Sequence, residues 1–203
     1  MGQRAGAMES MGIVMTGFGN IYKDKTILVT GHTGFKGSWL SIWLSELGAN
    51  VIGYSLDPYT EKDNFVLSGL KDKIIDIRGD IRDSEKLEQV FKEYKPEYVF
   101  HLAAQPLVRL SYDKPKETYE VNVMGTLNIL ECIRKYEATK YGILITTDKV
   151  YENKEWEWGY RETDELDGYD PYSNSKSCSE LVTHSYEKAF LKELGIAVST
   201  ARA

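Results

Sequence analysis

The sequence predicts an α/β fold, a doubly wound parallel sheet with helices on both faces, from three observations. From Lys25 onward, short apolar runs alternate with amphipathic stretches, which is the pattern of successive βαβ units. A glycine-rich turn, Thr30–Gly37, joins the first apolar run to the first amphipathic stretch. Late in the chain, Tyr172 and Lys176 stand one helical turn apart in a segment of helical periodicity. We therefore expect one domain over residues 21–203.

The first half of the chain is expected to hold three strands and two helices. The strands are predicted at residues 26–29, 51–56 and 73–77, which are short apolar runs. The first helix ends at Gly48, and its apolar positions recur at helical spacing at Trp39, Leu40, Trp43, Leu44 and Leu47. Asp83 is placed to cap the second helix, whose apolar stripe is Leu87, Val90, Phe91 and Tyr94.

The second half continues the alternation with three more strands, predicted at residues 98–104, 141–146 and 196–200. A long helix is expected from 116 to 136, with apolar positions at Val121, Met124, Ile129, Leu130 and Ile133. A last helix is expected from 171 to 194, ending at Gly195. Residues 151–170 carry many aromatic and acidic side chains without a steady period, which indicates a functional loop.

The bulk composition is that of a soluble globular protein with one sizeable core, since 42% of the 203 residues are hydrophobic and 28% are charged. A formal net charge of −6 argues against binding to nucleic acid or to an anionic membrane, because both need a basic face. The apolar runs are far shorter than the ~20 residues that cross a bilayer. Cys132 and Cys178 have no neighbouring cysteine, which indicates reduced thiols and a cytoplasmic setting.

Residues 1–20 differ from the rest of the chain. They hold four of the five methionines and no apolar run long enough for a signal peptide. We expect this segment to be a disordered leader or the result of an over-long choice of start codon.

The glycines of the first turn predict a phosphate-binding loop. Glycine permits positive φ, a close approach of backbone to a pyrophosphate, and tight packing of helix on strand. Gly31, Gly34 and Gly37 follow a strand and open a helix, whose first N–H groups and dipole attract an anion. Taken alone, the spacing also fits an ordinary glycine-containing turn.

A carboxylate at the end of the second strand supports dinucleotide binding. Asp57 lies about 20 residues after the last glycine, where a carboxylate accepts hydrogen bonds from an adenosine ribose. It would repel a 2′-phosphate, so NAD is favoured over NADP, although Lys36 within the loop weakens that exclusion. The alternative is a turn-forming Asp before Pro58.

The phenol of Tyr172 and the ammonium of Lys176 are predicted to share one helix face. A free phenol has a pKa of ~10, and a neighbouring ammonium together with an oxidised nicotinamide would lower it. Lowering it to ~7 corresponds to ~4 kcal/mol of electrostatic preference. The ionised Tyr172 then takes a hydroxyl proton while the adjacent carbon loses a hydride. Without the phosphate loop, the same spacing describes an ordinary helix surface.

Three polar residues follow the fifth strand, and catalytic groups of parallel sheets lie outside the carboxyl ends of strands. Thr147 is a candidate to hydrogen-bond a substrate oxygen, while Asp148 and Lys149 supply an acid and a potential base. The alternative is a polar loop in which Asp148 caps the turn. The three histidines are scattered without metal-ligand spacing, so we predict no metal site.

Together these motifs resemble those of the extended short-chain dehydrogenase/reductases with a Rossmann-type fold, and within them the nucleotide-sugar 4,6-dehydratases. The resemblance runs from about Lys25 to the end. It rests on the loop T-G-x-x-G-F-x-G, the fourth-strand motif, the asparagine-bearing helix and Y-x-x-x-K, here residues 30–37, 101–105, 121–126 and 172–176. Residues 31–40, 147–153, and 158–162 leading to 169–176 look specific to the branch that acts on CDP-glucose. The dTDP-glucose branch has Asp-Glu in place of Asp148-Lys149.

The resemblance implies NAD as cofactor and a nucleotide sugar as substrate. Besides Gly31, Gly34, Gly37, Asp57, Tyr172 and Lys176, the residues that it assigns to the cofactor are Thr33, Phe35, Lys36, Asp80, Ile81, Leu102, Ala103, Ala104 and Asn122. It also implies a homodimer or higher homo-oligomer and a place in 6-deoxyhexose and lipopolysaccharide O-antigen biosynthesis.

The reaction implied by the resemblance is an internal redox dehydration. Tyr172 deprotonates the 4-hydroxyl and NAD⁺ takes the hydride from carbon 4. Lys149 removes the proton on carbon 5, for which its pKa of ~10.4 must be lowered by burial beside Lys176. Asp148 protonates the departing 6-hydroxyl, and the hydride returns to carbon 6 to give a 4-keto-6-deoxy sugar.

Two other functions remain open from the residues. A nucleotide-sugar 4-epimerase needs the Tyr–Lys pair but not an acid at Asp148, and a non-catalytic NAD-binding module needs neither. In the family, the sixth strand leads into a smaller substrate-binding domain. Because the chain ends at Ala203, we expect that domain to be absent here.

Overall fold

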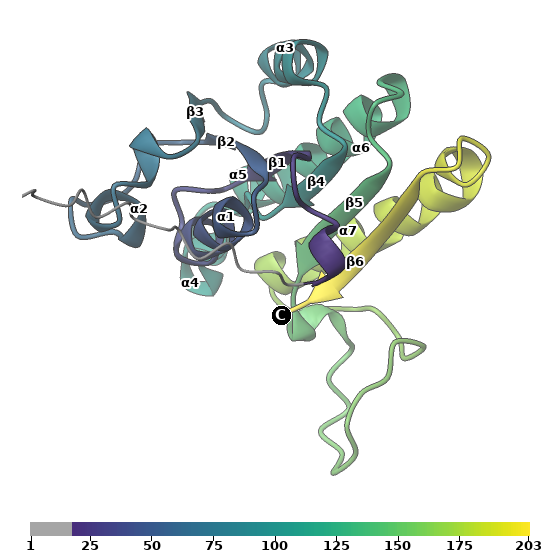
Figure 1. Ribbon diagram of the computed structural model, residues 1–203. Helices are drawn as coiled ribbons and strands as arrows, with labels where there is room; N and C mark the ends of the chain where they lie inside the picture. The colour runs from purple at the N-terminus through teal and green to yellow at the C-terminus, as the bar shows by residue number, and fades with distance from the viewer. Residues whose placement is uncertain (1–17) are drawn as a thin grey trace, which may run out of the picture.

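The computed structural model describes residues 18–203 (Figure 1). Most of the predicted leader, residues 1–17, lies outside the described residues. Phe18–Asn20 form a short 3-10 turn, and the Phe18 ring lies 5.5 Å from that of Trp43. The described chain therefore begins against the first helix of the domain.

A single six-stranded sheet organises the domain, with the strand order β3-β2-β1-β4-β5-β6. Its strands are β1 Thr26–Thr30, β2 Asn50–Ser55, β3 Ile75–Arg78, β4 Tyr98–His101, β5 Tyr141–Thr146 and β6 Ala197–Arg202. All five pairings between them are parallel. The order reverses between β1 and β4, which is the place where doubly wound sheets bind ligands. The predicted fold class is confirmed.

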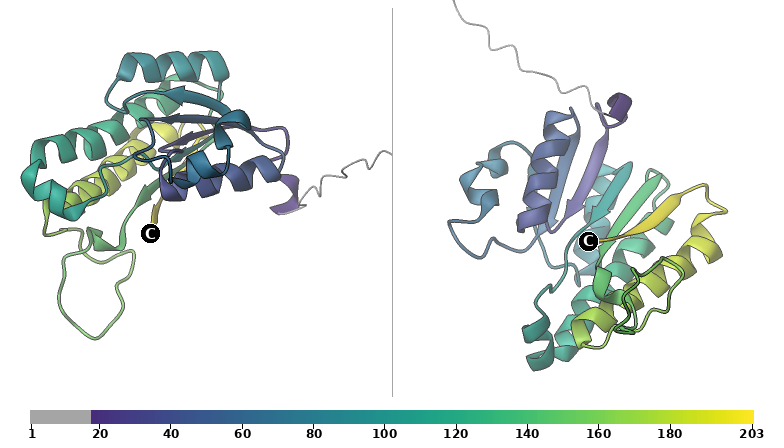
Figure 2. Two further views of the ribbon diagram at one scale, coloured as in Figure 1. Left: turned by 90° about the vertical axis from the view of Figure 1, so that its left-hand side faces the viewer. Right: turned by 90° about the horizontal axis from the view of Figure 1, so that it is seen from below.

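Helices cover the two faces of the sheet (Figure 2). One face carries α1 (Phe35–Glu46), followed by the short α2 (Asn64–Leu67) and the 3-10 turn η2 (Leu70–Asp72). The other face carries α3, α6 and α7. The remaining bounds are α3 Ser84–Tyr94, α4 Val108–Asp113, α5 Pro115–Tyr119, η3 Glu120–Met124, α6 Gly125–Lys135, η4 Asp148–Val150, α7 Pro171–Tyr186 and η5 Glu187–Leu191.

Two apolar cores lie on opposite faces because side chains alternate along a strand. In β1, Leu28 points into the larger core with α3 and α6. Its neighbours Ile27 and Val29 point into the smaller core beneath α1. The stripe predicted for α3 is confirmed, with Leu87 and Phe91 fully buried, and Asp83 caps that helix by accepting a hydrogen bond from the N–H of Lys86.

The first helix differs from the prediction in the face that it buries. Trp39 is 54% exposed and Trp43 is 48% exposed, although both belong to the predicted apolar series. The buried positions are Gly37, Ser38, Ser41 and Leu44. Small residues face the sheet because the helix packs closely on the glycine turn that precedes it.

Helix bounds also differ where the chain departs from a regular period. The predicted helix 116–136 is α5, η3 and α6 in one continuous run, with a π-helical turn at Glu120–Met124. Met124, the last residue of that turn, is 48% exposed. The fourth strand ends at His101, so residues 102–104 leave the sheet. The short helices α2 and α4 were not predicted, because neither is long enough to show a helical period.

Candidate functional site

The glycine turn between β1 and α1 is too close-packed for larger residues. Gly31 has φ +74°, and a Cβ on it would lie 2.8 Å from the N of Ala103. A Cβ on Gly37 would lie 2.1 Å from the carbonyl oxygen of Gly31. The first turn of α1 carries Lys36 and no acidic side chain. The turn therefore fits the pyrophosphate of a dinucleotide, which needs bare backbone and a helix N-terminus without negative charge.

Thr30 joins this turn to the chain that leaves β4. Its Oγ1 accepts hydrogen bonds from the N–H groups of Leu102 (3.1 Å) and Ala103 (3.2 Å), so its hydroxyl hydrogen is directed to Nδ1 of His101 at 2.8 Å. Burial and the nearby charge of Lys176 lower the pKa of His101 to about 3. His101 is thus a neutral bridge that holds residues 102–104 beside the glycine turn.

A cluster at the ends of β2 and β3 lies where the adenosine of a dinucleotide is expected. Asp57 has an 87% exposed side chain, and Nε of Arg78 lies 3.4 Å from its Oδ1. Arg78 also contacts Asp76 at 2.9 Å and stands 4.8 Å from the centre of the Phe65 ring. Sequence reasoning missed Arg78, although the parallel pairing of Arg78 with Ser55 places it at the same edge as Asp57.

His32 is part of the same cluster rather than an isolated histidine. It is fully buried and its Nε2 lies 2.8 Å from Asp76. Burial lowers the pKa of His32 more strongly than Asp76 raises it. Its ring lies against Gly53, where a Cβ would come within 2.4 Å. Thr33 is fixed nearby, with its Oγ1 2.9 Å from the hydroxyl oxygen of Ser55.

Asp80 and Ile81 follow β3, as predicted, but the carboxylate of Asp80 has a partner of its own. Hydrogen bonds from Arg82 hold the pKa of Asp80 below its usual range, and the closest contact is 2.6 Å. Ile81 is buried against Gly125. The carbonyl oxygens of this segment also have partners, since Tyr54 donates to that of Asp80 and Asn128 donates to that of Ile81.

Asn122 connects the π-helical turn to the last helix. It is 1% exposed, and its Oδ1 accepts a hydrogen bond from the N–H of Gln105 at 2.8 Å. Its Nδ2 donates to Oγ of Ser175 at 2.9 Å. The carbonyl oxygen of Asn122 accepts another bond from Ser179. This side chain therefore fixes α7 relative to the loop after β4.

Tyr172 and Lys176 lie one turn apart on α7, whose first turn is capped by Asp170 through the N–H of Ser173. Lys176 is 4% exposed, its Nζ donates to the carbonyl oxygen of Ile145 at 3.0 Å, and burial lowers its pKa to about 8. Burial raises the pKa of Tyr172, against the opposing effects of Thr147 and Lys149. The chain's own residues therefore do not produce the predicted lowering of the pKa of Tyr172.

Thr147, Asp148 and Lys149 follow β5 as predicted, in the 3-10 turn η4. Thr147 is 3% exposed and caps that turn. Lys149 lies 3.2 Å from Asp148, with side chains 57% and 75% exposed. The pairing lowers the pKa of Asp148. The burial expected to activate Lys149 as a base is thus not found, because its side chain points toward Asp148 and solvent.

The loop at residues 151–170 borders a pocket beside these residues, and it projects from the end of β5 (Figure 1). Rings of Tyr151 and Tyr160 stack with centres 5.0 Å apart, and Trp156 packs on Tyr160 at 5.4 Å. Trp158 is 78% exposed. The pocket has a volume of about 280 Å³ and is lined by Asp148, Lys149, Tyr151, Asn153, Tyr160, Tyr169, Asp170 and Ser173.

Within residues 18–203, no cluster of three or more His, Cys, Asp or Glu side chains is placed to hold a metal ion. None of the helices in this part of the chain combines the length and the apolar character that a membrane span requires.

Comparison with known proteins identifies relatives for both sequence and fold. The chain is 51% identical to the CDP-glucose 4,6-dehydratase of Salmonella typhimurium, over 91% of the chain and 53% of that protein. Among solved structures, the UDP-glucose 4-epimerase of Thermotoga maritima with UDP-glucose is 29% identical, with a TM-score of 0.76, over 87% of the chain and 54% of that structure. The UDP-glucose 4-epimerase of Thermus thermophilus in complex with NAD is also 29% identical, with a TM-score of 0.75 and the same coverage.

The chain spans about half the length of the curated relatives that it matches. A family model described as GDP-mannose 4,6 dehydratase matches residues 28–199, which include every strand except the first two residues of β1 and the last three of β6. The chain belongs to the GDP-mannose 4,6 dehydratase family.

Proposed function

We propose that this chain is the dinucleotide-binding part of a nucleotide-sugar 4,6-dehydratase that converts CDP-glucose to CDP-4-keto-6-deoxyglucose with bound NAD. One observation carries the proposal: Lys176, one turn after Tyr172 on α7, is buried and donates from Nζ to the carbonyl oxygen of Ile145, two residues before Thr147. The CDP-glucose specificity rests on the 51% identity to a dehydratase of that substrate.

The backbone of the glycine turn would hold the pyrophosphate of NAD, and Asp57 would accept hydrogen bonds from the adenosine ribose. Residues 102–104 and Asn122 would line the nicotinamide half. Bound NAD would accept the hydride from carbon 4 of the sugar and return it to carbon 6. The exposed carboxylate of Asp57 disfavours a 2′-phosphate, which supports NAD over NADP.

The chain's own residues would move the protons. Tyr172, as phenolate, removes the proton of the 4-hydroxyl, and the hydroxyl of Thr147 positions the same oxygen. Because burial raises the pKa of Tyr172, ionisation of this phenol needs a cation close to it. Lys176 supplies one when its ammonium turns from the carbonyl oxygen of Ile145 toward the phenol.

Asp148 and Lys149 would supply the acid and the base of the elimination. In the ion pair the carboxylate is ionised and the amine protonated, so a proton must pass from Lys149 to Asp148 before Lys149 can remove the carbon-5 proton and Asp148 can protonate the departing 6-hydroxyl. A sugar entering the adjoining pocket of about 280 Å³ would replace the solvent around both side chains.

A nucleotide-sugar 4-epimerase is the second candidate, because the two solved structures compared above are 4-epimerases. Epimerisation needs the Tyr172–Lys176 pair without an acid at Asp148. The Asp148–Lys149 ion pair favours the dehydratase, because only the dehydration needs an acid and a base at these positions.

The deciding experiment has two parts. The 203-residue chain is titrated with NADH, whose fluorescence reports binding. A longer form of the protein that extends past Ala203 is then incubated with CDP-glucose and NAD⁺, and the product is tested for the alkaline absorbance of a 4-keto-6-deoxy sugar. Formation of CDP-galactose instead would identify the epimerase, and NADH binding without either product would support a binding module.

We also propose that the protein is cytoplasmic, which its two free cysteines support, and that it forms a homodimer through its long helices. The dimer is supported by the exposed apolar side chains of α7, η3 and η5, among them Met124, Leu181 and Phe190. Sedimentation of the purified chain would give the mass of the assembly directly.

A further inference from the structure

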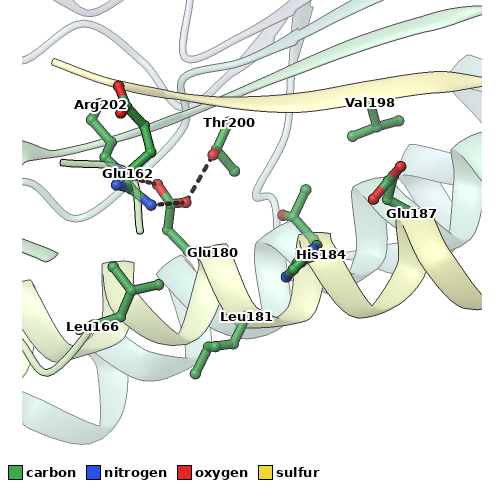
Figure 3. A pocket seen from close by; sticks show the side chains of 10 residues that line it. Glu162, Leu166, Glu180, Leu181, His184, Glu187, Val198, Thr200 and Arg202 are labelled. Atoms are coloured by element: carbon green, nitrogen blue, oxygen red, sulfur yellow. Dashed lines mark hydrogen bonds and ion pairs between the residues drawn. The ribbon is translucent and has the colours of Figure 1, made fainter. Parts of the chain in front are cut away.

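A buried ion pair lies behind the candidate active site, between α7 and β6 (Figure 3). Arg202 donates from Nε to Oε1 of Glu180 and from Nη2 to Oε2, both at 3.0 Å. The side chains are 17% and 6% exposed. Such a two-point pairing fixes the guanidinium in one orientation.

Glu180 connects this pair to the end of β5. Its carboxylate accepts a hydrogen bond from Thr146, which directly precedes Thr147, and another from Thr200 at 2.8 Å. Tyr172, Lys176 and Glu180 are spaced at successive turns of α7, so the three lie along one side of that helix.

Arg202 connects the same pair to the other end of the η4 turn. It donates to the hydroxyl of Tyr151 at 2.5 Å, and its guanidinium stands 4.8 Å from the centre of that ring. Ser177 of α7 donates to the carbonyl oxygen of Val150 at 2.7 Å. The segment from Thr147 to Val150 is therefore anchored on both sides, through Thr146 by Glu180 and through Tyr151 by Arg202.

We propose that Glu180 and Arg202 are positioning residues, whose ion pair holds the Thr147–Lys149 segment against α7 and keeps the carboxylate of Glu180 away from Lys176. The inference rests on the proposed function for the roles of Thr147 and Lys176. Neither residue of the pair needs to touch the substrate.

The second half of this proposal concerns the charges that face Lys176. Two groups on other elements interact electrostatically with Lys176, namely Lys36 at the start of α1 and His101 of β4. On α7 itself, Tyr172 and Glu180 lie one turn before and one turn after it. Glu180 is the acidic group that raises the pKa of Lys176, yet its oxygens are occupied by Arg202 and two threonines. With Arg202 removed, that carboxylate is free to pair with Lys176.

The first test is a titration of Lys176 in the 203-residue chain, using lysine labelled with carbon-13 at Cε and assigned with Lys176→Met. In Arg202→Gln we expect Lys176 to titrate about 1 pH unit higher, because an opposite charge becomes available. In Glu180→Gln we expect it to titrate lower. The control Thr200→Val removes one bond to Glu180 without touching either anchor, and should leave the titration unchanged.

Shifts of opposite sign distinguish this role from a general loss of structure, which would move Lys176 in the same direction in both variants. Equal shifts, or no shift in Arg202→Gln, would overturn the charge half of the proposal. The conservative Arg202→Lys should restore the wild-type titration, because it keeps a cation beside Glu180.

The second test keeps the ion pair intact, so it remains informative if the charge variants fail to fold. Tyr151→Phe removes the hydroxyl that Arg202 binds but keeps the ring. We expect amide hydrogen exchange of residues 148–150 to become about tenfold faster, the loss of one anchoring bond, while Thr200→Val leaves it unchanged. Unchanged exchange in Tyr151→Phe would overturn the anchoring. NADH binding is measured in each variant, and its absence from the wild-type chain would count against the proposed function instead.

Discussion

The ammonium of Lys176 lies 3.0 Å from the carbonyl oxygen of Ile145, near the end of β5 and just before the Thr147–Lys149 segment. That single hydrogen bond holds a buried cation that has no carboxylate within ion-pair distance among residues 18–203. Burial of the amine lowers its pKa to about 8, against an ordinary value of ~10.4. The folded chain therefore binds this proton less tightly than the unfolded chain does.

The pH dependence of stability should carry the signature of Lys176. Between pH 8 and the pKa of the unfolded chain, the unfolded state holds the proton that the folded state has lost, so stability rises with pH. Below pH 8 both states are protonated and the full cost of burying the cation, about 3 kcal/mol at most, is present. Lys176→Met should therefore be more stable than the wild type at pH 7, and the difference should shrink toward pH 10. Urea unfolding at both pH values measures it.

The opposite trend, a difference that grows with pH, would mean that Lys176 is stabilised as a cation. Lys140→Met, on the surface before β5, serves as the control because its ammonium is not buried.

Substitution of Gly37 should weaken dinucleotide binding. A Cβ there would lie 2.1 Å from the carbonyl oxygen of Gly31, so Gly37→Ala must distort the turn, at a cost of about 1–3 kcal/mol in stability. We expect NADH affinity to fall by about tenfold or more. The matched control is Gly159→Ala, since a Cβ there meets nothing within 4 Å. Equal NADH affinity in the two variants would show that the turn does not hold the cofactor.

Asp57 should decide between the two nicotinamide cofactors. Asp57→Asn removes the charge that repels a 2′-phosphate and leaves Arg78, 3.4 Å away, with Asp76 as its remaining acidic partner. We expect weaker NADH binding by about tenfold and tighter NADPH binding. Fluorescence titrations with both cofactors measure the ratio. If the NADH-to-NADPH preference stays the same, Asp57 is only a turn residue before Pro58.

Proton exchange at carbon 5 should separate the roles of Asp148 and Lys149. In the longer form of the protein, Lys149→Ala should stop incorporation of solvent deuterium at carbon 5, whereas Asp148→Asn should allow exchange but block loss of the 6-hydroxyl. Mass spectrometry of the recovered sugar distinguishes the two. Exchange that persists in Lys149→Ala would assign the base to another group or to water.

Much of the fold was predictable because its signals are local. Each strand is a short apolar run, and the βα alternation with parallel pairing leaves few topologies. The glycine turn and the Tyr172–Lys176 spacing marked the two ends of the candidate site for the same reason. Residues at the ends of neighbouring strands, such as Asp57, could be placed because their position follows from the sheet.

What could not be predicted depends on packing between distant segments. The exposure of Trp39 and Trp43 follows from the closeness of α1 to the sheet, which no helical period reveals. Arg78 and Arg202 are separated from their partners Asp57 and Glu180 by 20 or more residues. Lys149 is exposed because its side chain pairs with the neighbouring Asp148 at the surface instead of packing beside Lys176.

The π-helical turn at Glu120–Met124 lets the continuous helix from α5 to α6 contact both α7 and the sheet. An added residue rotates all that follows by about 100° relative to all that precedes it. Asn122 is thereby aimed at Ser175 while Ile129 and Ile133 still face the sheet. Deleting a single residue here would yield a more regular helix, yet it would swing the asparagine away from α7 or the isoleucines away from the core.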